Sequence, residues 1–302
     1  MNILCVGHIA YDTTYIINDD LLEDKKIKAQ DKIEEVGGRG YNYAYILNKL
    51  GLTPYIAGVI GNDYIGNKIK EKIKETNINT KYLKTDDIKT SSSVIISNVK
   101  TSSRTIITNK NTGNIDDIDI NDKFDLILLD GSEYNTSIKV IENNKDAIII
   151  LDAEKKSDEI LDLCHKVDYI ICSKDFACDV TNMEFNLNDL EKICKKLENI
   201  FDKNIIITLG KYGSIYKNKD KIILKPTIEV NSIDTTSSGD IYHAVFAYGL
   251  IKKWNIDKII RISNELASYS TTKLGKDNKI PSKEEIREII NDFEWSDDDN
   301  LT

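Results

Sequence analysis

The sequence predicts an α/β protein, a three-layer sandwich in which helices cover both faces of a mostly parallel central sheet. Two observations carry this prediction. Short apolar, β-branched runs recur along the chain, and each is typical of a strand buried on both faces: 3–6, 55–60, 126–129, 147–151, 169–172 and 205–208. Segments with helical spacing of apolar residues lie between most of them: 42–50, 65–76, 137–144, 158–165 and 187–201. Alternating strands and helices favour parallel strand pairing.

Most of the predicted strands are followed by a glycine or a polar residue. These positions are Gly7, Gly61, Asp130, Asp152, Ser173 and Gly210. In open parallel sheets, ligands bind beyond the carboxyl ends of the strands. The sequence therefore predicts that a binding site lies along this edge of the sheet.

Three further strand-like segments break the alternation, because no helix separates them from their neighbours. They cover residues 13–18, 92–99 and 104–108, and they predict a small antiparallel sheet. We expect this sheet to form a lid from inserts at approximately 12–35 and 90–110 of a single domain spanning 1–302. An ordinary edge hairpin without a gating role is the alternative. The acidic end, 296–302, is expected to be a flexible, solvated tail.

Composition excludes several classes of function. The net charge is -9, which disfavours a nucleic-acid-binding protein. No run of about 18 apolar residues is present, and the first residues lack a signal-peptide pattern. The five cysteines show no paired C-x-x-C spacing, so we expect reduced core thiols rather than a metal site. These features together favour a cytoplasmic protein that binds no membrane.

The segment 234–240 reads D-T-T-S-S-G-D and precedes apolar residues at helical spacing. Small residues before a helix leave free backbone N–H groups at the positive end of the helix dipole, where anions bind. Such amides stabilise the charge of a phosphoryl-transfer transition state. Asp240 fits the catalytic base that accepts a hydroxyl proton, although aspartate at a helix start is also a common cap.

Two further segments combine glycines with polar residues. Residues 37–42 read G-G-R-G-Y-N. The glycines would let a ligand approach the backbone closely, and Asn42 would offer it an amide. A tight turn with a capping asparagine explains the pattern equally well. The third glycine of a dinucleotide fingerprint is absent, which disfavours an oxidoreductase. Residues 208–213 follow a predicted strand and read T-L-G-K-Y-G, with a β-hairpin after them.

In combination, these segments resemble the PfkB (ribokinase-like) carbohydrate kinase family over nearly the whole chain. The G-G-x-G-x-N segment at 37–42 and the D-T-T-S-S-G-D segment at 234–240 match the two family signatures in order and approximate separation. Several shorter stretches look similar to the ketohexokinase-like branch: 90–93, 103–106, 130–131 and 173–175.

The resemblance implies a kinase that uses ATP with Mg²⁺, and it allows a monovalent cation and a homodimer formed through the lid. It implies that Asp240 is the catalytic base and that the backbone amides of three preceding residues form the anion hole: Ser237, Ser238 and Gly239. Residues expected to face the substrate are Asp12, Gly38, Arg39, Asn42 and Arg104. Residues expected to border the nucleotide are Thr208, Gly210, Gly213 and Asn264, the last on a helix over 264–273.

The sequence departs from the family pattern at three places. Ser237 and Ser238 stand where the family usually has Gly and Ala, and a serine at 237 would be strained if its φ is positive. Residues 173–176 replace the N-x-x-E segment that helps to organise magnesium, so the metal ligands are not assigned. Arg39 replaces a sugar-contacting residue, and it would suit an acidic substrate or point into solvent.

We therefore expect phosphoryl transfer from ATP to a hydroxyl of a sugar-like small molecule. A nucleoside kinase of the same fold is one alternative, because a fold does not fix the substrate. A regulatory protein that binds nucleotide or sugar without turnover is another, since it would tolerate the departures at Ser237 and Ser238.

Overall fold

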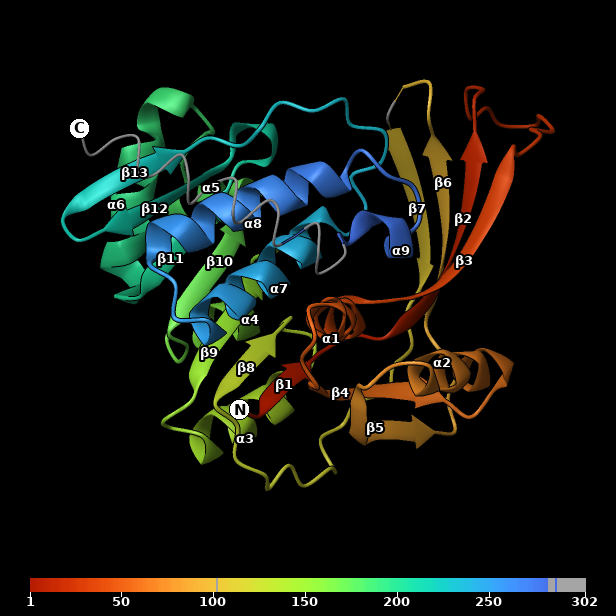
Figure 1. The fold of residues 1–302 in the computed structure, drawn as a ribbon, viewed down its shortest axis with the longest axis horizontal. Helices are drawn as coiled ribbons and strands as arrows, with labels where there is room; N and C mark the ends of the chain where they lie inside the picture. Colours follow the sequence, from red (N-terminus) through yellow and green to blue (C-terminus); the bar gives the residue numbers. More distant parts are fainter. Residues whose placement is uncertain (102, 282–285, 287–302) are drawn as a thin grey trace.

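The computed structural model describes residues 1–101, 103–281 and 286. Figure 1 shows a central twisted sheet covered by helices, with a second, smaller sheet standing at one side of it. The expected acidic tail, 296–302, lies outside the described residues.

Within the described residues the central sheet has the strand order β13-β12-β11-β10-β9-β8-β1-β4-β5. Every pairing from β11 to β5 is parallel, and only the two pairings of β12, with β11 and with β13, are antiparallel. This confirms the predicted mostly parallel sheet. The strands are β1 (Ile3–Val6), β4 (Tyr55–Gly61), β5 (Asn79–Asp86), β8 (Leu126–Leu129), β9 (Ile148–Ala153), β10 (Tyr169–Ser173), β11 (Asn204–Thr208), β12 (Ser214–Asn218) and β13 (Lys221–Lys225).

Helices pack on both faces of this sheet, so successive strand residues enter two different cores. In β1, Ile3 and Cys5 pack into one apolar cluster and Leu4 and Val6 into the other. The first cluster lies under α1 (Arg39–Lys49), α2 (Tyr64–Lys74), α7 (Ser238–Ile251) and α8 (Ile256–Ser270). The second lies under α3 (Tyr134–Asn143), α4 (Asp158–Cys164), α5 (Lys174–Thr181) and α6 (Leu190–Phe201).

The smaller sheet, called the lid sheet here, has the order β3-β2-β6-β7. Its strands are β2 (Ala10–Ile17), β3 (Asp31–Gly37), β6 (Ser92–Asn98) and β7 (Ser103–Asn109). The predicted small sheet is confirmed, although one of its pairings, between β2 and β6, is parallel. The other two pairings are antiparallel. β2 follows β1 and β6 follows β5, so both strands leave the parallel central sheet in the same direction.

Some elements differ from the sequence prediction for identifiable physical reasons. β3 was not predicted because its sequence D-K-I-E-E-V-G is rich in charge, yet pairing with β2 satisfies its backbone. The helix expected over 264–273 is α8, which begins at Ile256 because the side chain of Asn255 accepts a hydrogen bond from the Lys258 N–H at 2.8 Å. Helix α5 follows β10 directly and was also not predicted.

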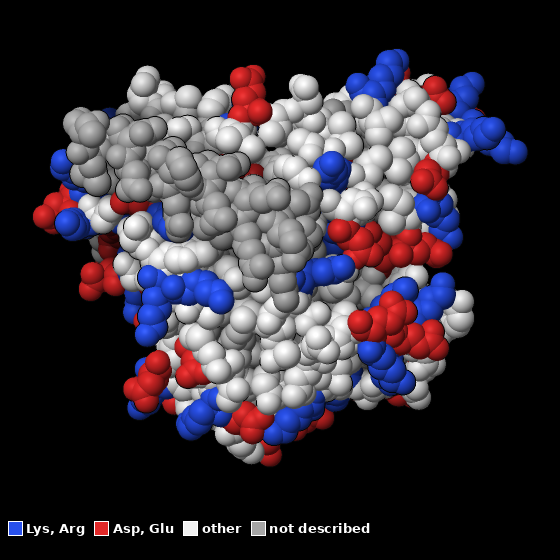
Figure 2. All heavy atoms as spheres, viewed as in Figure 1, with Lys and Arg blue, Asp and Glu red and all other residues white. Residues whose placement is uncertain are grey.

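Charges of both signs are interspersed over the face of the molecule that Figure 2 shows, without a dominant basic area among its described residues. No helix in the described part of the chain combines the length and apolar character needed to cross a membrane.

Candidate functional site

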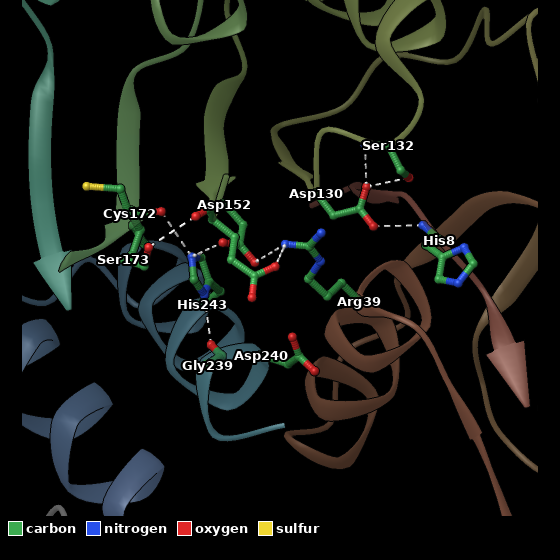
Figure 3. A network of polar contacts seen from close by, with 12 residues as sticks. His8, Arg39, Asp130, Ser132, Asp152, Cys172, Ser173, Gly239, Asp240 and His243 are labelled. Carbon is green, nitrogen blue, oxygen red and sulfur yellow. Dashed lines mark hydrogen bonds and ion pairs between the residues drawn. The ribbon is translucent and has the colours of Figure 1, made fainter. Parts of the chain in front are cut away.

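Polar groups converge where the carboxyl ends of β8, β9 and β10 meet the first turns of α1 and α7. Figure 3 shows Asp130, Asp152 and Ser173 at these strand ends, with Arg39 and Asp240 reaching toward them from the two helices. The structure thus brings together two motifs and three strand ends that are far apart in the sequence. This is the edge of the sheet at which the sequence predicted a site.

Helix α7 begins inside the D-T-T-S-S-G-D segment. Its N-cap, Ser237, has φ 60° and ψ 7°, so the left-handed conformation that would strain a serine is present. The backbone turns there, and Ser238, Gly239 and Asp240 form the first turn of the helix. The amides of a first helical turn have no acceptor within the helix. The segment therefore presents N–H donors where an anion would be stabilised.

Asp240 is buried, and its carboxylate is held by a neutral partner. The Asn42 Nδ2 group donates to Asp240 Oδ2 at 2.5 Å and lies 3.3 Å from Ser237 Oγ. Burial is the main cause that raises the pKa of Asp240 above its ordinary value, and the charge of Asp152 adds to it. The Asn42 hydrogen bond and the charges of Arg39 and His243 act to lower this pKa. A carboxylate with a raised pKa is a better proton acceptor for a hydroxyl.

A buried lysine fixes the orientation of the Asn42 amide. Lys276, in the short helix α9 (Lys276–Lys279), donates from Nζ to Asn42 Oδ1 at 2.5 Å and also to the Val36 carbonyl. A flipped amide would place its NH₂ group against this ammonium and its oxygen against the carboxylate of Asp240. The amide of Asn42 is thus fully engaged, and a substrate hydroxyl that contacts it must replace one of these bonds.

The guanidinium of Arg39 contacts carboxylates and does not simply point into solvent. Its guanidinium lies 3.5 Å from Asp152 Oδ2 and 3.1 Å from Glu154 Oε2, and Figure 3 shows it between Asp152 and Asp130. Burial by itself would lower the pKa of Arg39, but these three carboxylates together raise it. The positive charge is therefore largely balanced within the protein.

Two residues that sequence reasoning missed complete this network. The Tyr43 hydroxyl donates to Asp152 Oδ2 at 2.6 Å. His243 lies one turn after Gly239 on α7, with Nδ1 2.7 Å from the Gly239 carbonyl oxygen and Nε2 3.5 Å from Asp152 Oδ1. The one available signal was the position of His243 three residues after Asp240 on the motif helix. Asp152 is consequently a structural hub that ties α1 and α7 to β9.

The lid sheet supplies the other wall of the site. Asp12 on β2 pairs in register with Glu35 on β3, and both face a small space bounded by Ser237, Lys276 and Lys279. Gly38 has φ 87°, and a side chain there would collide with the His8 carbonyl, with its Cβ only 2.3 Å from that oxygen. A glycine is therefore required where α1 starts.

Arg104 reaches from the lid sheet to the D-T-T-S-S-G-D segment. It lies on β7, and its Nη1 donates to the Thr235 hydroxyl oxygen. This contact spans from the lid sheet to the loop that precedes α7. Arg104 thus links the lid sheet to the motif in this structure.

The residues expected to border the nucleotide lie at the end of β11, in the turn between β11 and β12, and on α8. Thr208 ends β11, and its hydroxyl donates to the Cys172 carbonyl at 3.2 Å. Gly213 has φ 91°, and its Cβ would lie 2.1 Å from the Lys225 carbonyl oxygen, while the equivalent position at Gly210 is open. Asn264 is buried and joins α8 to the hairpin, accepting from Ser214 Oγ at 2.5 Å and donating to the Lys225 carbonyl at 3.0 Å. Its amide is occupied within the protein.

Comparison with known proteins identifies the family. The model of the pfkB family carbohydrate kinases matches residues 1–283. The chain belongs to this family. Within it, the chain is 25% identical to the ribokinase of Bacillus subtilis (strain 168) over 311 residues, covering 96% of this chain and 99% of the relative. It is 22% identical to the nucleoside kinase of Methanocaldococcus jannaschii, covering 95% and 96%.

Solved structures of pfkB-type kinases share the fold. The ribokinase of Thermotoga maritima superposes with a TM-score of 0.81 at 23% identity, covering 96% of this chain and 99% of that one. The ribokinase of Arabidopsis thaliana, solved with ribose and ATP, gives a TM-score of 0.77 at 19% identity, covering 95% and 97%. The ribokinase-like fold is therefore confirmed, and the protein is an ATP-dependent kinase of the sugar and nucleoside kinase type.

Proposed function

We propose that this pfkB-family carbohydrate kinase transfers the γ-phosphoryl group of ATP to a hydroxyl of a neutral sugar, with Asp240 as the catalytic base. One observation carries the proposal: a buried carboxylate with a raised pKa stands in the first turn of α7, beside amides that have no helical acceptor. The substrate hydroxyl loses its proton to Asp240 as its oxygen attacks the γ-phosphorus. The bond from that phosphorus to the bridging oxygen breaks, and ADP leaves.

The backbone amides of Ser237, Ser238 and Gly239 would stabilise the negative charge on the transferring group. Ser237 turns the backbone just before the helix begins, and the Ser238 N–H makes only a long hydrogen bond of 3.4 Å to the Thr235 carbonyl. Preorganised donors of this kind stabilise a transition state without rearranging during the reaction. The serines at 237 and 238 keep these donors, because the N–H groups belong to the backbone.

The charges that line the site favour a neutral, hydroxyl-rich acceptor over an anionic one. Asp12 and Glu35 line the wall formed by the lid sheet, and the charge of Arg39 is balanced by Asp152 and Glu154. An additional phosphate or carboxylate on the substrate would be repelled by Asp12 and Glu35. Sugar hydroxyls, in contrast, can donate to the carboxylate of Asp12.

A nucleoside acceptor is the second candidate, and one cavity favours it. A space of about 210 Å³ opens at His8, with Ile9, Val59 and Asn111 among its walls. Its walls are mainly polar, with Lys110, Ser132 and Glu133 among them, so they offer hydrogen bonds to the edge of a nucleobase attached to the sugar. In this alternative the ribose would still lie between Asp12 and Asp240.

Magnesium would be bound mainly through the phosphates of ATP. No group of three His, Cys, Asp or Glu side chains that could hold a metal exists among the described residues. Magnesium in kinases commonly keeps several waters and uses few carboxylates, so this fits, with Glu154 as the nearest exposed acid of the network. The ion, when bound with ATP, neutralises charge on the phosphates. Asp175, at the start of α5, is the other candidate on this edge.

We further propose that the protein acts in the cytoplasm and pairs through its lid sheet. ATP is the phosphoryl donor, and the cysteines at 5, 164, 172, 178 and 194 are all free thiols. On the outer face of the lid sheet, Val94 and Ile107 are paired in register and are 38% and 62% exposed. Burying them against a second copy would remove apolar surface from water.

The deciding experiment measures ADP release from MgATP across a panel of ketoses, aldoses, sugar acids, phosphosugars and nucleosides. Turnover with a neutral sugar supports the proposal, and turnover restricted to nucleosides supports the second candidate. If only phosphosugars or sugar acids react, the assignment of a neutral acceptor is wrong. Tight ATP binding without turnover on any acceptor would instead favour a regulatory binding protein.

A further inference from the structure

Helix α9 contributes a second buried lysine, which the proposed reaction does not use. Lys279 is 2% exposed, and its ammonium donates to three oxygens: Asp234 Oδ2 at 2.6 Å, the Thr236 carbonyl at 2.8 Å and the Asp234 carbonyl at 3.2 Å. An ammonium carries three protons, so its bonding capacity is filled. Buried lysines are rare unless they are paired in this way.

All three oxygens belong to the loop that leads into the anion hole. Thr236 directly precedes Ser237, and the carbonyl of one residue and the N–H of the next point in opposite directions across a planar trans peptide. When Lys279 holds the Thr236 carbonyl, it also turns the Ser237 N–H to the opposite side of the loop. Lys279 thus fixes the direction of a proposed anion-hole donor through a single peptide plane.

The rest of the loop is fixed by bonds that cooperate with this one. The Thr236 N–H donates to Asp234 Oδ1 at 2.9 Å, and the Asp234 N–H donates to the Thr271 carbonyl at 3.0 Å. Asp234 therefore uses one carboxylate oxygen for the loop and the other for Lys279. Removing the ammonium would leave two carbonyls and one carboxylate oxygen turned toward an empty point.

Such an oxygen set is the kind that binds a monovalent metal cation, since backbone carbonyls can replace the water shell of potassium. In this chain the ammonium of Lys279 already occupies the point where these oxygens meet. A potassium ion could bind there only if Lys279 withdrew, because both need the same oxygens and like charges repel. The site does not fit the monovalent cation that the sequence allowed.

We propose that Lys279 is a built-in monovalent cation that positions the anion hole, so that phosphoryl transfer needs no added potassium. The proposal rests on the proposed kinase function. Burial lowers the pKa of Lys279, and the carboxylate of Asp234 opposes this through its charge and its hydrogen bond. The charge of Glu35 also raises the pKa of Lys279, whereas the charge of Arg104 lowers it.

The first test uses the unmodified protein in potassium, sodium and tetramethylammonium chloride at equal ionic strength. We expect kcat to differ by less than about twofold among the three salts, because an ion without a site cannot shift the protein. The melting temperature should likewise be the same in potassium and tetramethylammonium. A requirement for potassium of about tenfold or more in kcat would overturn the proposal.

The second test replaces the ammonium with an uncharged side chain of similar size. In Lys279→Met, we expect kcat in tetramethylammonium to fall about 10²-fold, with a much smaller change in the KM for ATP, because the lost interaction acts on the transition state. Potassium or ammonium ions should restore part of kcat and raise the melting temperature of this variant alone. Lys72→Met, which removes an exposed lysine of α2, is the matched control and should behave like the unmodified protein.

Two outcomes of the second test would contradict the proposal. One is full activity of Lys279→Met in tetramethylammonium. The other is a folded but impaired variant that no cation activates or stabilises. If Lys279→Met does not fold, Lys279→Gln replaces it, since an amide donates to the same carbonyls without a charge.

The melting measurements separate this proposal from the kinase function on which it rests. If no acceptor is phosphorylated, the proposed function fails by itself. Potassium-specific stabilisation of the variant, absent from the unmodified protein, would still show that Lys279 fills a cation site. Equal stabilisation of both proteins by potassium would show that it does not.

Discussion

The D-T-T-S-S-G-D segment begins and ends with a buried aspartate, and the two have opposite electrostatic surroundings. Asp234 contacts the ammonium of Lys279 at 2.6 Å, whereas Asp240 accepts from the neutral amide of Asn42 at 2.5 Å. Burial acts to raise the pKa of Asp234, but the charge of Lys279 and the hydrogen bonds from Lys279 and Thr236 hold it below its ordinary value. For Asp240, burial prevails and the pKa is raised.

The comparison shows that a cationic partner offsets burial at Asp234, whereas the deeper burial of Asp240 prevails over its neutral hydrogen-bond partner. A carboxylate paired with a cation stays ionised and holds the loop, which makes it a structural anchor. A carboxylate paired with an amide has greater affinity for a proton, which makes it a base. The following predictions test this division, in order of decreasing expected effect.

Asp240→Asn should cause the largest loss. The amide is nearly the same size but cannot accept the hydroxyl proton, so we expect kcat to fall about 10³-fold. The affinity for ATP, measured by calorimetry, should change little because the backbone amides remain. Activity within about tenfold of the unmodified enzyme would show that Asp240 only caps the helix.

Asp234→Asn should affect stability more than chemistry. The change leaves Lys279 buried without its counter-charge, so we expect the free energy of unfolding to fall by about 3 kcal/mol. We expect kcat to fall about tenfold, since the two carbonyls still hold the loop. Urea unfolding and turnover of both asparagine variants, measured side by side, provide the check. A larger loss of kcat here than in Asp240→Asn would reverse the two assignments.

Asn42→Ala should move the pH dependence of the reaction. The base must be ionised, so the rate falls as the pH falls through the pKa of Asp240. The Asn42 hydrogen bond lowers this pKa, so its removal raises the pKa and shifts the acid limb of kcat/KM to higher pH. An unshifted limb in the pH–rate profile would mean that another group titrates.

Ser237→Gly should have the smallest effect, and it should stabilise the protein rather than destabilise it. Glycine adopts the left-handed conformation of residue 237 without strain, so we expect the free energy of unfolding to rise by about 1 kcal/mol, with kcat nearly unchanged. Ser238→Gly is the matched control: this residue is the first of α7, and its hydroxyl donates to the Thr235 carbonyl at 3.0 Å, so glycine should destabilise the protein by about 0.5 kcal/mol. If both variants change the free energy of unfolding in the same direction, residue 237 is not strained.

Much of the fold followed from local sequence patterns. Fully apolar runs such as 126–129 could only be buried strands, and their alternation with helical segments predicted the parallel sheet, which the structure confirms. The lid strand β3 escaped prediction because its charged residues are tolerated only at the edge of a sheet with one exposed face. The parallel pairing of β2 with β6 depends on chain segments far apart and had no local signal.

The site residues within a recognisable motif could be predicted from the sequence. Those that join the site only because folding buries them could not. The segment 234–240 placed Asp240 at a helix start, as the structure shows. Lys276 and Lys279, however, lie in the polar sequence K-D-N-K, which is typical of an exposed turn. They are buried because the return of the chain from α8 places them against Val36, Asn42 and the loop before α7. Tyr43 and His243 were also missed, because only contacts between distant segments of the chain place them in the site.

The sequence by itself determined the alternation of strands and helices, the resemblance to the pfkB kinases and the segments that contain the proposed reacting groups. These depend on periodicity and on short motifs, which are local properties of the chain. Only the tertiary structure decided which aspartate meets an ammonium and which meets an amide. Asn42 lies 198 residues before Asp240, and Lys279 lies 45 residues after Asp234. A pKa depends on charges and donors within a few ångströms, and folding alone brings these together.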